Sequence, residues 1–303
     1  MMPPLRLGTR GSPLALAQAR MVATALRDAH GWRPERIEII PITTTGDQIR
    51  DRPLAEVGGK GLWTRELDRA LAENRTDISV HSMKDVETIR PAEFALAAML
   101  PRADVTDRLI GAESLAAVPQ GARFGTSSPR RAAQLLARRP DLAIVTFRGN
   151  VETRLRKIAL GEADATLLAS AGLIRLGHDD VGIVLDDMLP APAQGAVGIE
   201  CRADDKRVRQ WMRAIDDAAT HACVAAERRL LAGLGGTCRS AVAALATLEE
   251  GQIRLRAEIL SPDGREVVAE EARFAADDEA APGEMARAML ARASFDLRAL
   301  FAG

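Results

Sequence analysis

The chain has 303 residues and a mass of 32.5 kDa, which is enough for about two domains or three smaller ones. Hydrophobic residues make up 47% and charged residues 27%, which excludes disordered, collagen-like and disulfide-scaffold proteins. The net charge is −1, aromatics are 3% and Tyr is absent, so neither long-range charge nor ring stacking favours nucleic acid or an anionic membrane. We therefore expect no nucleic-acid partner and no membrane partner.

The localisation is predicted from three features: the first residues, the longest uncharged stretch and the cysteines. The first residues, Met1–Arg6, have no apolar core of the kind found in signal peptides. No uncharged stretch approaches the ~20 residues that a membrane helix needs. The three cysteines, Cys201, Cys223 and Cys238, are an odd number without metal-ligand spacing. We expect a cytoplasmic protein without a metal site.

The first hundred residues alternate between strand and helix patterns. Ser12 and Pro13 are typical of a helix start, and Gly31 is a typical stop. The expected strands are Leu5–Gly8, Glu35–Ile42, Asp77–Met83 and Phe94–Leu100, and the expected helices are Pro13–Gly31 and Trp63–Leu71. Residues 43–61 have no period and predict a long loop, which is usually functional or mobile.

The same alternation continues from about Pro101. The expected strands are Ala122–Thr126, Leu142–Phe147, Ala165–Ser170 and Ala196–Cys201, and the expected helices are Ser127–Arg139, Val151–Leu160 and a short one that ends near Gly177. Strands that alternate with helices at this spacing predict parallel sheets in α/β units.

The pattern changes from about Asp216. A helix over Ala218–Leu231 is followed by a glycine-rich turn and by alternating strands over Val242–Phe274, with a hairpin turn at Ser261–Gly264. An amphipathic helix over Pro282–Phe301 closes the chain. The sequence shows no internal repeat. It predicts two α/β units followed by a smaller α+β unit.

Four polar clusters follow predicted strands, where ligands bind in open α/β sheets. They are Thr9–Ser12, Ser82–Asp85, Gly125–Arg131, and Arg148–Asn150 with Arg154. Two of these clusters open helices, whose free amides favour an anion, and arginine forks hold carboxylates or phosphates. A solvated basic face explains any single arginine equally well. For five or more arginines at strand ends, we favour an anion-lined cleft.

The loop Gly58–Gly61 invites comparison with a phosphate-binding loop. The Walker pattern needs Ser or Thr after the lysine and an earlier glycine, but Gly61 and Leu54 stand there. We interpret the segment as a flexible lid, and a plain flexible loop is the alternative.

Asp85 is the carboxylate of greatest interest, because it follows an apolar strand and stands beside Lys84. A carboxylate that faces an arginine-rich cleft stays ionised, so it could stabilise a developing cation or accept protons. Taken alone, a structural ion pair explains Asp85 equally well.

The cysteines and histidines give weaker signals. Cys238 follows a glycine-rich turn and precedes Arg239, which favours thiolate character, although a plain structural thiol stays open. Cys201 and Cys223 lie in apolar segments and are expected in the core. The four histidines form no ligand-spaced cluster, and His81 differs from the others only by its position at a strand end.

Taken together and in order, these stretches resemble the hydroxymethylbilane synthase, or porphobilinogen deaminase, family over nearly the whole chain. The matching stretches are Thr9–Leu16, Val57–Leu62, Val80–Val86, Gly125–Ser128 with Arg130 and Arg131, Arg148–Val151 with Thr153–Leu155, and Gln194–Glu200. Each stretch is weak alone, and the ordered set is specific.

The resemblance implies a fold, an activity and a cofactor. The implied fold is two periplasmic-binding-protein-like α/β domains, at residues 1–100 with 196–215 and at 101–195, plus a smaller C-terminal α+β domain with an antiparallel sheet at 216–303. The implied enzyme condenses four porphobilinogen molecules head to tail with release of ammonia, and water then frees linear hydroxymethylbilane. The family builds a dipyrromethane cofactor and joins it to one cysteine through a thioether.

The resemblance also implies roles for individual residues. It maps the catalytic aspartate to Asp85 and the cofactor-bearing cysteine to Cys238, and it places Lys60 and Trp63 in the lid. It maps the cofactor and substrate ligands to Arg10, Ser12, Lys84, Thr126, Ser128, Arg130, Arg131, Arg148, Arg154 and Arg175. Trp63 stands where phenylalanine is frequent in the family.

The chemistry of the substrate agrees with these assignments. Each pyrrole carries an acetate and a propionate, so the growing chain is a polyanion that needs many charge-assisted bonds. Loss of ammonia leaves an electrophilic cation that a fixed carboxylate stabilises. A two-lobed protein that binds small anions without catalysis is the alternative, and we expect a monomer in either case.

Overall fold

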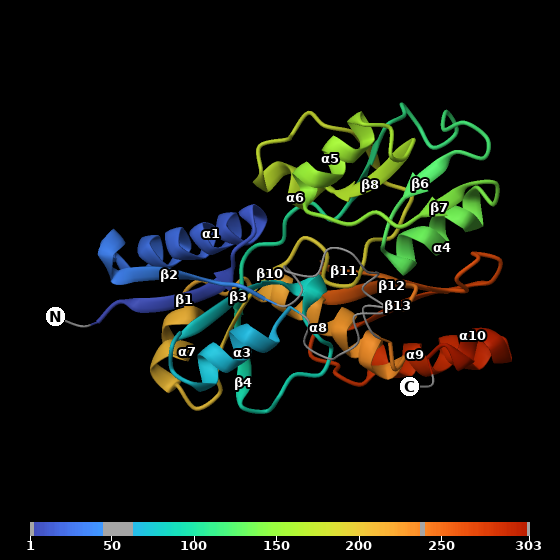
Figure 1. The fold of residues 1–303 in the computed structure, drawn as a ribbon. Helices are drawn as coiled ribbons and strands as arrows, with labels where there is room; N and C mark the ends of the chain where they lie inside the picture. Colours follow the sequence, from blue (N-terminus) through green and yellow to red (C-terminus); the bar gives the residue numbers. More distant parts are fainter. Residues whose placement is uncertain (1–2, 45–62, 237–239, 302–303) are drawn as a thin grey trace. The chain divides into compact units, whose positions relative to one another are not determined.

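The protein is described by a computed structural model that covers residues 3–44, 63–236 and 240–301 (Figure 1). These residues divide into two compact units. Unit 1 contains residues 3–44, 63–103 and 195–221, and unit 2 contains residues 104–194, 222–236 and 240–301.

Unit 1 is built on a five-stranded sheet with the order β2-β1-β3-β10-β4. Its elements are β1 (Leu5–Arg10), α1 (Pro13–His30), η1 (Pro34–Arg36), β2 (Ile37–Ile42), α3 (Arg65–Ala72), β3 (Ile78–Ser82), η2 (Met83–Asp85), β4 (Phe94–Met99), β10 (Val197–Arg202) and α7 (Lys206–Arg213). The strands β1, β2 and β3 are parallel, and β10 is antiparallel to both of its neighbours.

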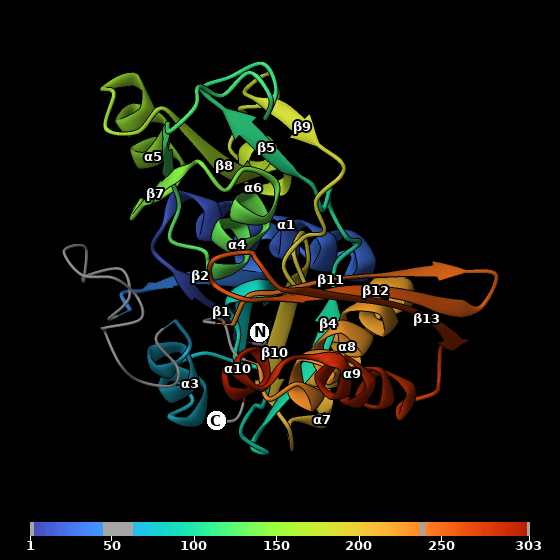
Figure 2. The same ribbon diagram turned by 90° about the vertical axis from the view of Figure 1, so that its right-hand side faces the viewer.

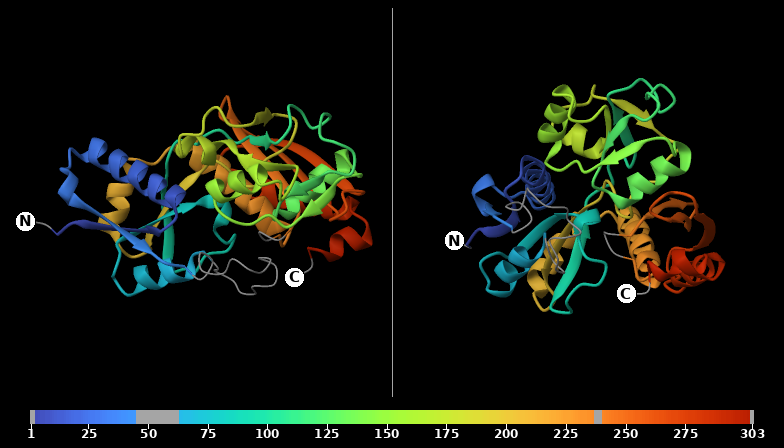
Figure 3. Two further views of the ribbon diagram at one scale, coloured as in Figure 1. Left: turned by 45° about the horizontal axis from the view of Figure 1, so that its top comes forward. Right: turned by 45° about the vertical axis from the view of Figure 1, so that its right-hand side comes forward.

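Helices cover both faces of this sheet. The helix α1 begins where predicted, because Ser12 accepts from the backbone N–H of Ala15, and it ends at Gly31 with φ 62°. Its apolar stripe, which includes Leu26, packs on the sheet. The helix α3 packs through Leu67 against β2. Figure 3 shows α1 on one side of the sheet and α3 on the other.

Unit 2 contains a second five-stranded sheet, with the order β7-β6-β8-β5-β9. Its elements are β5 (Asp107–Ile110), β6 (Arg123–Gly125), α4 (Pro129–Arg138), β7 (Ala143–Val145), α5 (Val151–Ala159), β8 (Ala165–Ala169), α6 (Ser170–Arg175) and β9 (Ile183–Leu185). Here β6, β7 and β8 are parallel, and β5 is antiparallel to β8 and β9. The second sheet therefore repeats the pattern of the first.

The rest of unit 2 is an antiparallel sheet with helices on it. Its elements are α8 (Ala218–Gly233), whose first turn belongs to unit 1, β11 (Val242–Glu249), β12 (Gln252–Leu260), β13 (Val267–Ala275), α9 (Ala281–Arg292) and α10 (Phe295–Ala299). Leu230 of α8, Leu255 of β12 and Met289 of α9 share one apolar cluster, and Figure 2 shows both helices below the sheet. The turn after β12 closes with Gly264 at φ 70°, as the sequence predicted.

These three sheets confirm two α/β regions and a smaller α+β region with an antiparallel sheet. Three details differ from the sequence prediction. Each five-stranded sheet has one antiparallel strand, the elements β5, β9 and α7 were not predicted, and the last helix is two helices because Ser294 caps a new one. The division into three domains stays a prediction. In the described part of the chain, no helix has the length and apolarity to span a membrane.

Candidate active site

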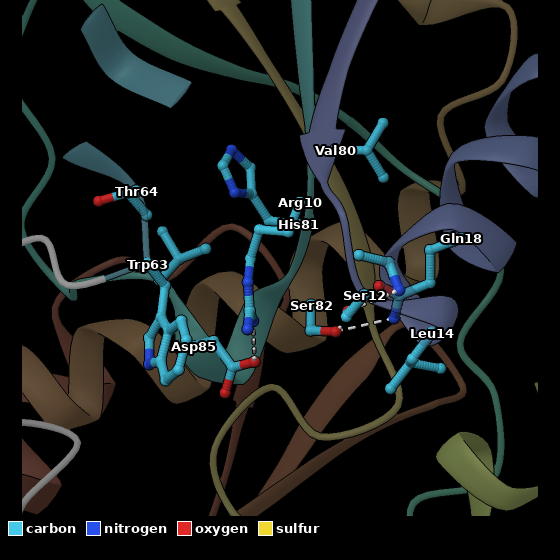
Figure 4. A pocket seen from close by; sticks show the side chains of 12 residues that line it. Arg10, Ser12, Leu14, Gln18, Trp63, Thr64, Val80, His81, Ser82 and Asp85 are labelled. Atoms are coloured by element: carbon cyan, nitrogen blue, oxygen red, sulfur yellow. Dashed lines mark hydrogen bonds and ion pairs between the residues drawn. The ribbon is translucent and has the colours of Figure 1, made fainter. Parts of the chain in front are cut away.

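A pocket of about 50 Å³ opens in unit 1 at the carboxyl ends of β1 and β3 (Figure 4). Because these strands are parallel neighbours, their ends lie at the same edge of the sheet. The residues at this edge include four of the predicted site, Arg10, Ser12, Trp63 and Asp85, and two further residues, His81 and Ser82.

Asp85 and Arg10 form the charged part of this pocket. The Nη1 of Arg10 lies 3.9 Å from the Oδ2 of Asp85, whose side chain is 39% exposed, so the pair is loose and open to solvent. The guanidinium of Arg10 also stacks over the indole of Trp63, with its central carbon 3.9 Å from the ring centroid. Stacking uses the face of the guanidinium and orients its in-plane N–H groups.

The floor of the pocket is fixed by hydrogen bonds. Gln18, which is 2% exposed, donates from Nε2 to Ser82 Oγ at 2.8 Å and joins α1 to the end of β3. The backbone N–H of Met83 donates to the carbonyl of Ala196 at 3.1 Å and holds the start of η2. Asp85 thus sits on a backbone turn that is secured on two sides. Lys84, which was also predicted, is half-buried on the same turn.

A buried charge network lies beside the pocket. The Nε2 of His81 is 3.1 Å from the Oε2 of Glu200. Arg90 donates to the same carboxylate from Nε at 2.8 Å and from Nη2 at 2.9 Å. Burial alone would raise the pKa of Glu200, but hydrogen bonds from His81 and Arg90 lower it to about 2. Sequence reasoning missed this network, because Arg90 and His81 lie 110 and 119 positions away from Glu200.

A second cluster lies in unit 2, where α4 follows β6. Arg130 and Arg131, both predicted as anion ligands, are 3% and 6% exposed. Arg131 holds Asp107 in a fork, from Nε at 3.1 Å and Nη2 at 2.7 Å, and Arg130 Nη2 donates to the same carboxylate at 2.8 Å. Burial raises the pKa of Asp107, but the two guanidinium groups outweigh this effect and hold the pKa well below its usual range. Asp107 was not predicted.

Thr126 and Ser128 shape the turn that leads into this cluster. Ser128 caps α4 by accepting from the Arg131 N–H, and Thr126 Oγ1 accepts from the Ser128 N–H at 3.1 Å. Their hydroxyls lie at the N-terminus of a ten-residue helix with no acidic residue in its first turn. This end of α4 therefore favours negative charge.

The remaining predicted arginines also lie in unit 2. Arg154 is half-buried and donates from Nε to the carbonyl of Gly149 at 3.0 Å. Arg148 is half-buried, and its Nη1 has no acceptor among the described residues. Arg175 ends α6, and burial lowers the pKa of its guanidinium.

Two predicted residues, Lys60 of the lid and Cys238, lie outside the described residues. The other two cysteines are in the core as expected, and burial raises the pKa of Cys201 to about 11. No group of histidine, cysteine or acidic side chains within the described ranges could hold a metal ion.

Comparison with known proteins places these residues in a family. Residues 5–210 match the family model described as "porphobilinogen deaminase, dipyromethane cofactor binding domain", and residues 221–291 match that of the porphobilinogen deaminase C-terminal domain. The chain belongs to the porphobilinogen deaminase family. The resemblance inferred from the ordered motifs is thereby confirmed.

Curated members of this family match over nearly the full length. The porphobilinogen deaminase of Sphingopyxis alaskensis is 57% identical over 99% of this chain and 97% of its own. The one from Paracoccus denitrificans is 51% identical over 97% and 96%. Solved structures that match include an ancestral cationic amino acid solute binding protein, with 18% identity, a TM-score of 0.45 and coverage of 70% and 88%.

Proposed function

We propose that the protein is a hydroxymethylbilane synthase, a transferase that joins four porphobilinogen molecules head to tail. Each condensation releases ammonia, and water finally frees the linear tetrapyrrole. Within the full-length family match, the observation that carries this proposal is the position of Asp85, a solvent-reachable carboxylate at the strand ends whose nearest contact with Arg10 is 3.9 Å long.

Asp85 is proposed as the catalytic residue. When ammonia leaves porphobilinogen, positive charge spreads over the ring, and a carboxylate fixed nearby lowers the energy of that cation. Asp85 is suited to this work because Arg10 lies 3.9 Å away and does not neutralise it through a close fork. The same oxygens can accept the pyrrole N–H and the proton that is lost when the ring regains aromaticity.

Arg10, Ser12 and Lys84 are proposed to bind the carboxylates of the substrate. Trp63 orders Arg10 before the substrate arrives, so less side-chain entropy is lost on binding. Each charge-assisted hydrogen bond to an acetate or propionate contributes about 1.5–3 kcal/mol. Ser12 provides a hydroxyl at the N-terminus of α1, which favours a carboxylate there.

The residues of unit 2 fit a cofactor with several carboxylates. Two buried donors, Arg130 Nε and Arg148 Nη1, have no acceptor within the described ranges, and buried donors need one. When bound, the dipyrromethane supplies the pyrrole end to which the first substrate is joined. We propose that it is attached to the sulfur of Cys238. Its carboxylates would be held by Thr126, Ser128, Arg130, Arg131, Arg148, Arg154 and Arg175.

Intact mass under denaturing conditions tests the attachment. We expect the purified enzyme to exceed the polypeptide mass by two linked pyrroles, and Cys238→Ala to lose both this excess and the colour with Ehrlich's reagent. The matched control, Cys223→Ala, removes a buried thiol and should keep the adduct. A bare polypeptide that still makes hydroxymethylbilane would contradict the cofactor assignment. A bare polypeptide that binds anions without turnover would favour the alternative, a small-anion binding protein.

We also propose that the enzyme acts as a monomer in the cytoplasm without nucleic acid, since no step described above needs a second subunit. Light scattering of the active enzyme checks this proposal. A dimer mass that persists at assay dilution would contradict it.

A further inference from the structure

The carboxylate of Asp107 receives hydrogen bonds from two directions in unit 2. Three come from Arg130 and Arg131 in the first turn of α4. The fourth comes from Gln194, whose Nε2 donates to Asp107 Oδ1 at 2.9 Å and to the carbonyl of Val105 at 2.7 Å. Asp107 is 2% exposed, so water does not compete for these bonds.

The two buried guanidinium groups of this cluster face two acids. Asp107 accepts from both of them, and Glu258, which accepts from Gln134 at 2.8 Å, adds a second negative charge near Arg130. A buried donor that lacks an acceptor costs free energy until one is supplied. Arg130 Nη1 donates to Gln134 and to the carbonyl of Leu189, whereas its buried Nε has no acceptor within the described ranges.

Gln194 links this cluster to helix α8. The backbone N–H of its neighbour Ala193 donates to Glu227 of α8 at 2.5 Å, and the other oxygen of Glu227 accepts from the N–H of Ala246 in β11 at 2.7 Å. Glu227 is fully buried. The position of Gln194, and through it that of Asp107, is therefore fixed by the C-terminal sheet.

We propose that Asp107 is a positioning residue for cofactor loading. By holding Arg130 and Arg131 at fixed angles, it leaves the buried Nε of Arg130 ready for a carboxylate of the dipyrromethane, and Gln194 keeps the carboxylate of Asp107 in register. This inference rests on the proposed function and assigns a role to residues that would not touch the reacting atoms.

The test follows adduct formation on the apoprotein. Wild type and variants are purified from cells that cannot make porphobilinogen and are then incubated with porphobilinogen. The adduct is followed by intact mass over time, and the folded fraction is measured by circular dichroism. We expect Asp107→Asn to load about 10- to 100-fold more slowly per folded molecule, as for loss of one charge-assisted contact. The control Asp164→Asn, which breaks an exposed ion pair with Arg123, should load like wild type.

A second variant decides the matter if Asp107→Asn does not fold. Gln194→Met removes one neutral donor and keeps the volume, and we expect a folded protein that loads about threefold to tenfold more slowly. Raising the porphobilinogen concentration should restore part of the rate, which a merely structural defect would not allow. Loading of either folded variant at the wild-type rate would overturn the inference. Failure of the wild type to take up any adduct would instead overturn the proposed function.

Discussion

The edges of the two five-stranded sheets are built alike and charged differently. In each unit, a serine caps the helix that follows the first parallel strand, Ser12 in one and Ser128 in the other, with proline next. Six residues later each helix carries a buried glutamine, Gln18 or Gln134, that joins it to its surroundings. We call this arrangement of strand end, serine cap and buried glutamine a frame. It is present once in each unit, although the sequence shows no repeat.

The carboxylates on these two frames behave in opposite ways. Asp85 is 39% exposed and has an arginine at 3.9 Å, whereas Asp107 is buried and accepts from four side-chain nitrogens. A buried carboxylate whose oxygens all accept hydrogen bonds fixes the basic side chains around it. A carboxylate with only one distant ion pair can instead interact with a substrate. We therefore propose that the reaction takes place in unit 1 and tight anion binding in unit 2.

The largest expected effect is a difference in stability between a variant of Arg131 in unit 2 and a variant of Arg10 in unit 1. Arg131→Met should lower the free energy of unfolding of the apoprotein by about 3–5 kcal/mol, because it removes two charge-assisted hydrogen bonds to buried Asp107. Arg10→Met is the matched variant in unit 1, and loss of its 3.9 Å pair with the partly exposed Asp85 should cost less than about 1 kcal/mol. Urea unfolding measures the free energy of unfolding of both variants. Equal losses of stability would contradict the claim that the arginines of unit 2 are held more tightly than Arg10.

Asp85→Asn should separate activity from stability. We expect product formation to fall about 10²- to 10³-fold, as for loss of one preorganised charge contact, with the urea midpoint unchanged. The exposed Asp28→Asn on α1 is the control and should change neither quantity. Turnover of Asp85→Asn near the control rate would show that another group stabilises the cation.

Much of the frame follows from local sequence signals. The cap at Ser12 and the stop at Gly31 were predicted, because capping depends only on neighbouring residues. The strand β5 was missed because two of its four residues are charged, and β9 was missed because acidic residues lie before and after its three residues. The helix α7 was missed because its four basic residues conceal the apolar pair Val208 and Met212.

The site was predicted only where it lies at a strand end. Asp85 has that local signature, since an apolar strand precedes it. Asp107 and Glu200 are engaged by side chains 23 to 119 positions away, which no local pattern records. A sequence pattern shows which residues are polar and which are buried, but it does not show which buried charges meet.

The free energy of unfolding at acid pH should depend more on buried Glu200 than on the exposed acidic residues. Its folded-state pKa of about 2 lies below the ordinary value of 4.5, so its contribution, about 3 kcal/mol at neutral pH, is lost as the pH falls through that interval. We expect Glu200→Gln to be less stable at pH 7 and to lose less than wild type between pH 5 and pH 2. Urea midpoints across this range check the slope, with the exposed Glu284→Gln as control. Parallel slopes for all three proteins would contradict the buried ion pair.

The smallest expected effect tests whether the two frames are equivalent. Ser12 accepts from the Ala15 N–H at 3.3 Å and Ser128 from the Arg131 N–H at 3.4 Å, so each removes one unpaired donor from a helix start. Changing either serine to alanine should lower the free energy of unfolding by about 1 kcal/mol, and glycine should cost only a few tenths. Urea unfolding of the apoprotein measures both pairs. A loss at Ser12 without one at Ser128 would show that the buried arginines, rather than the cap, determine where α4 begins.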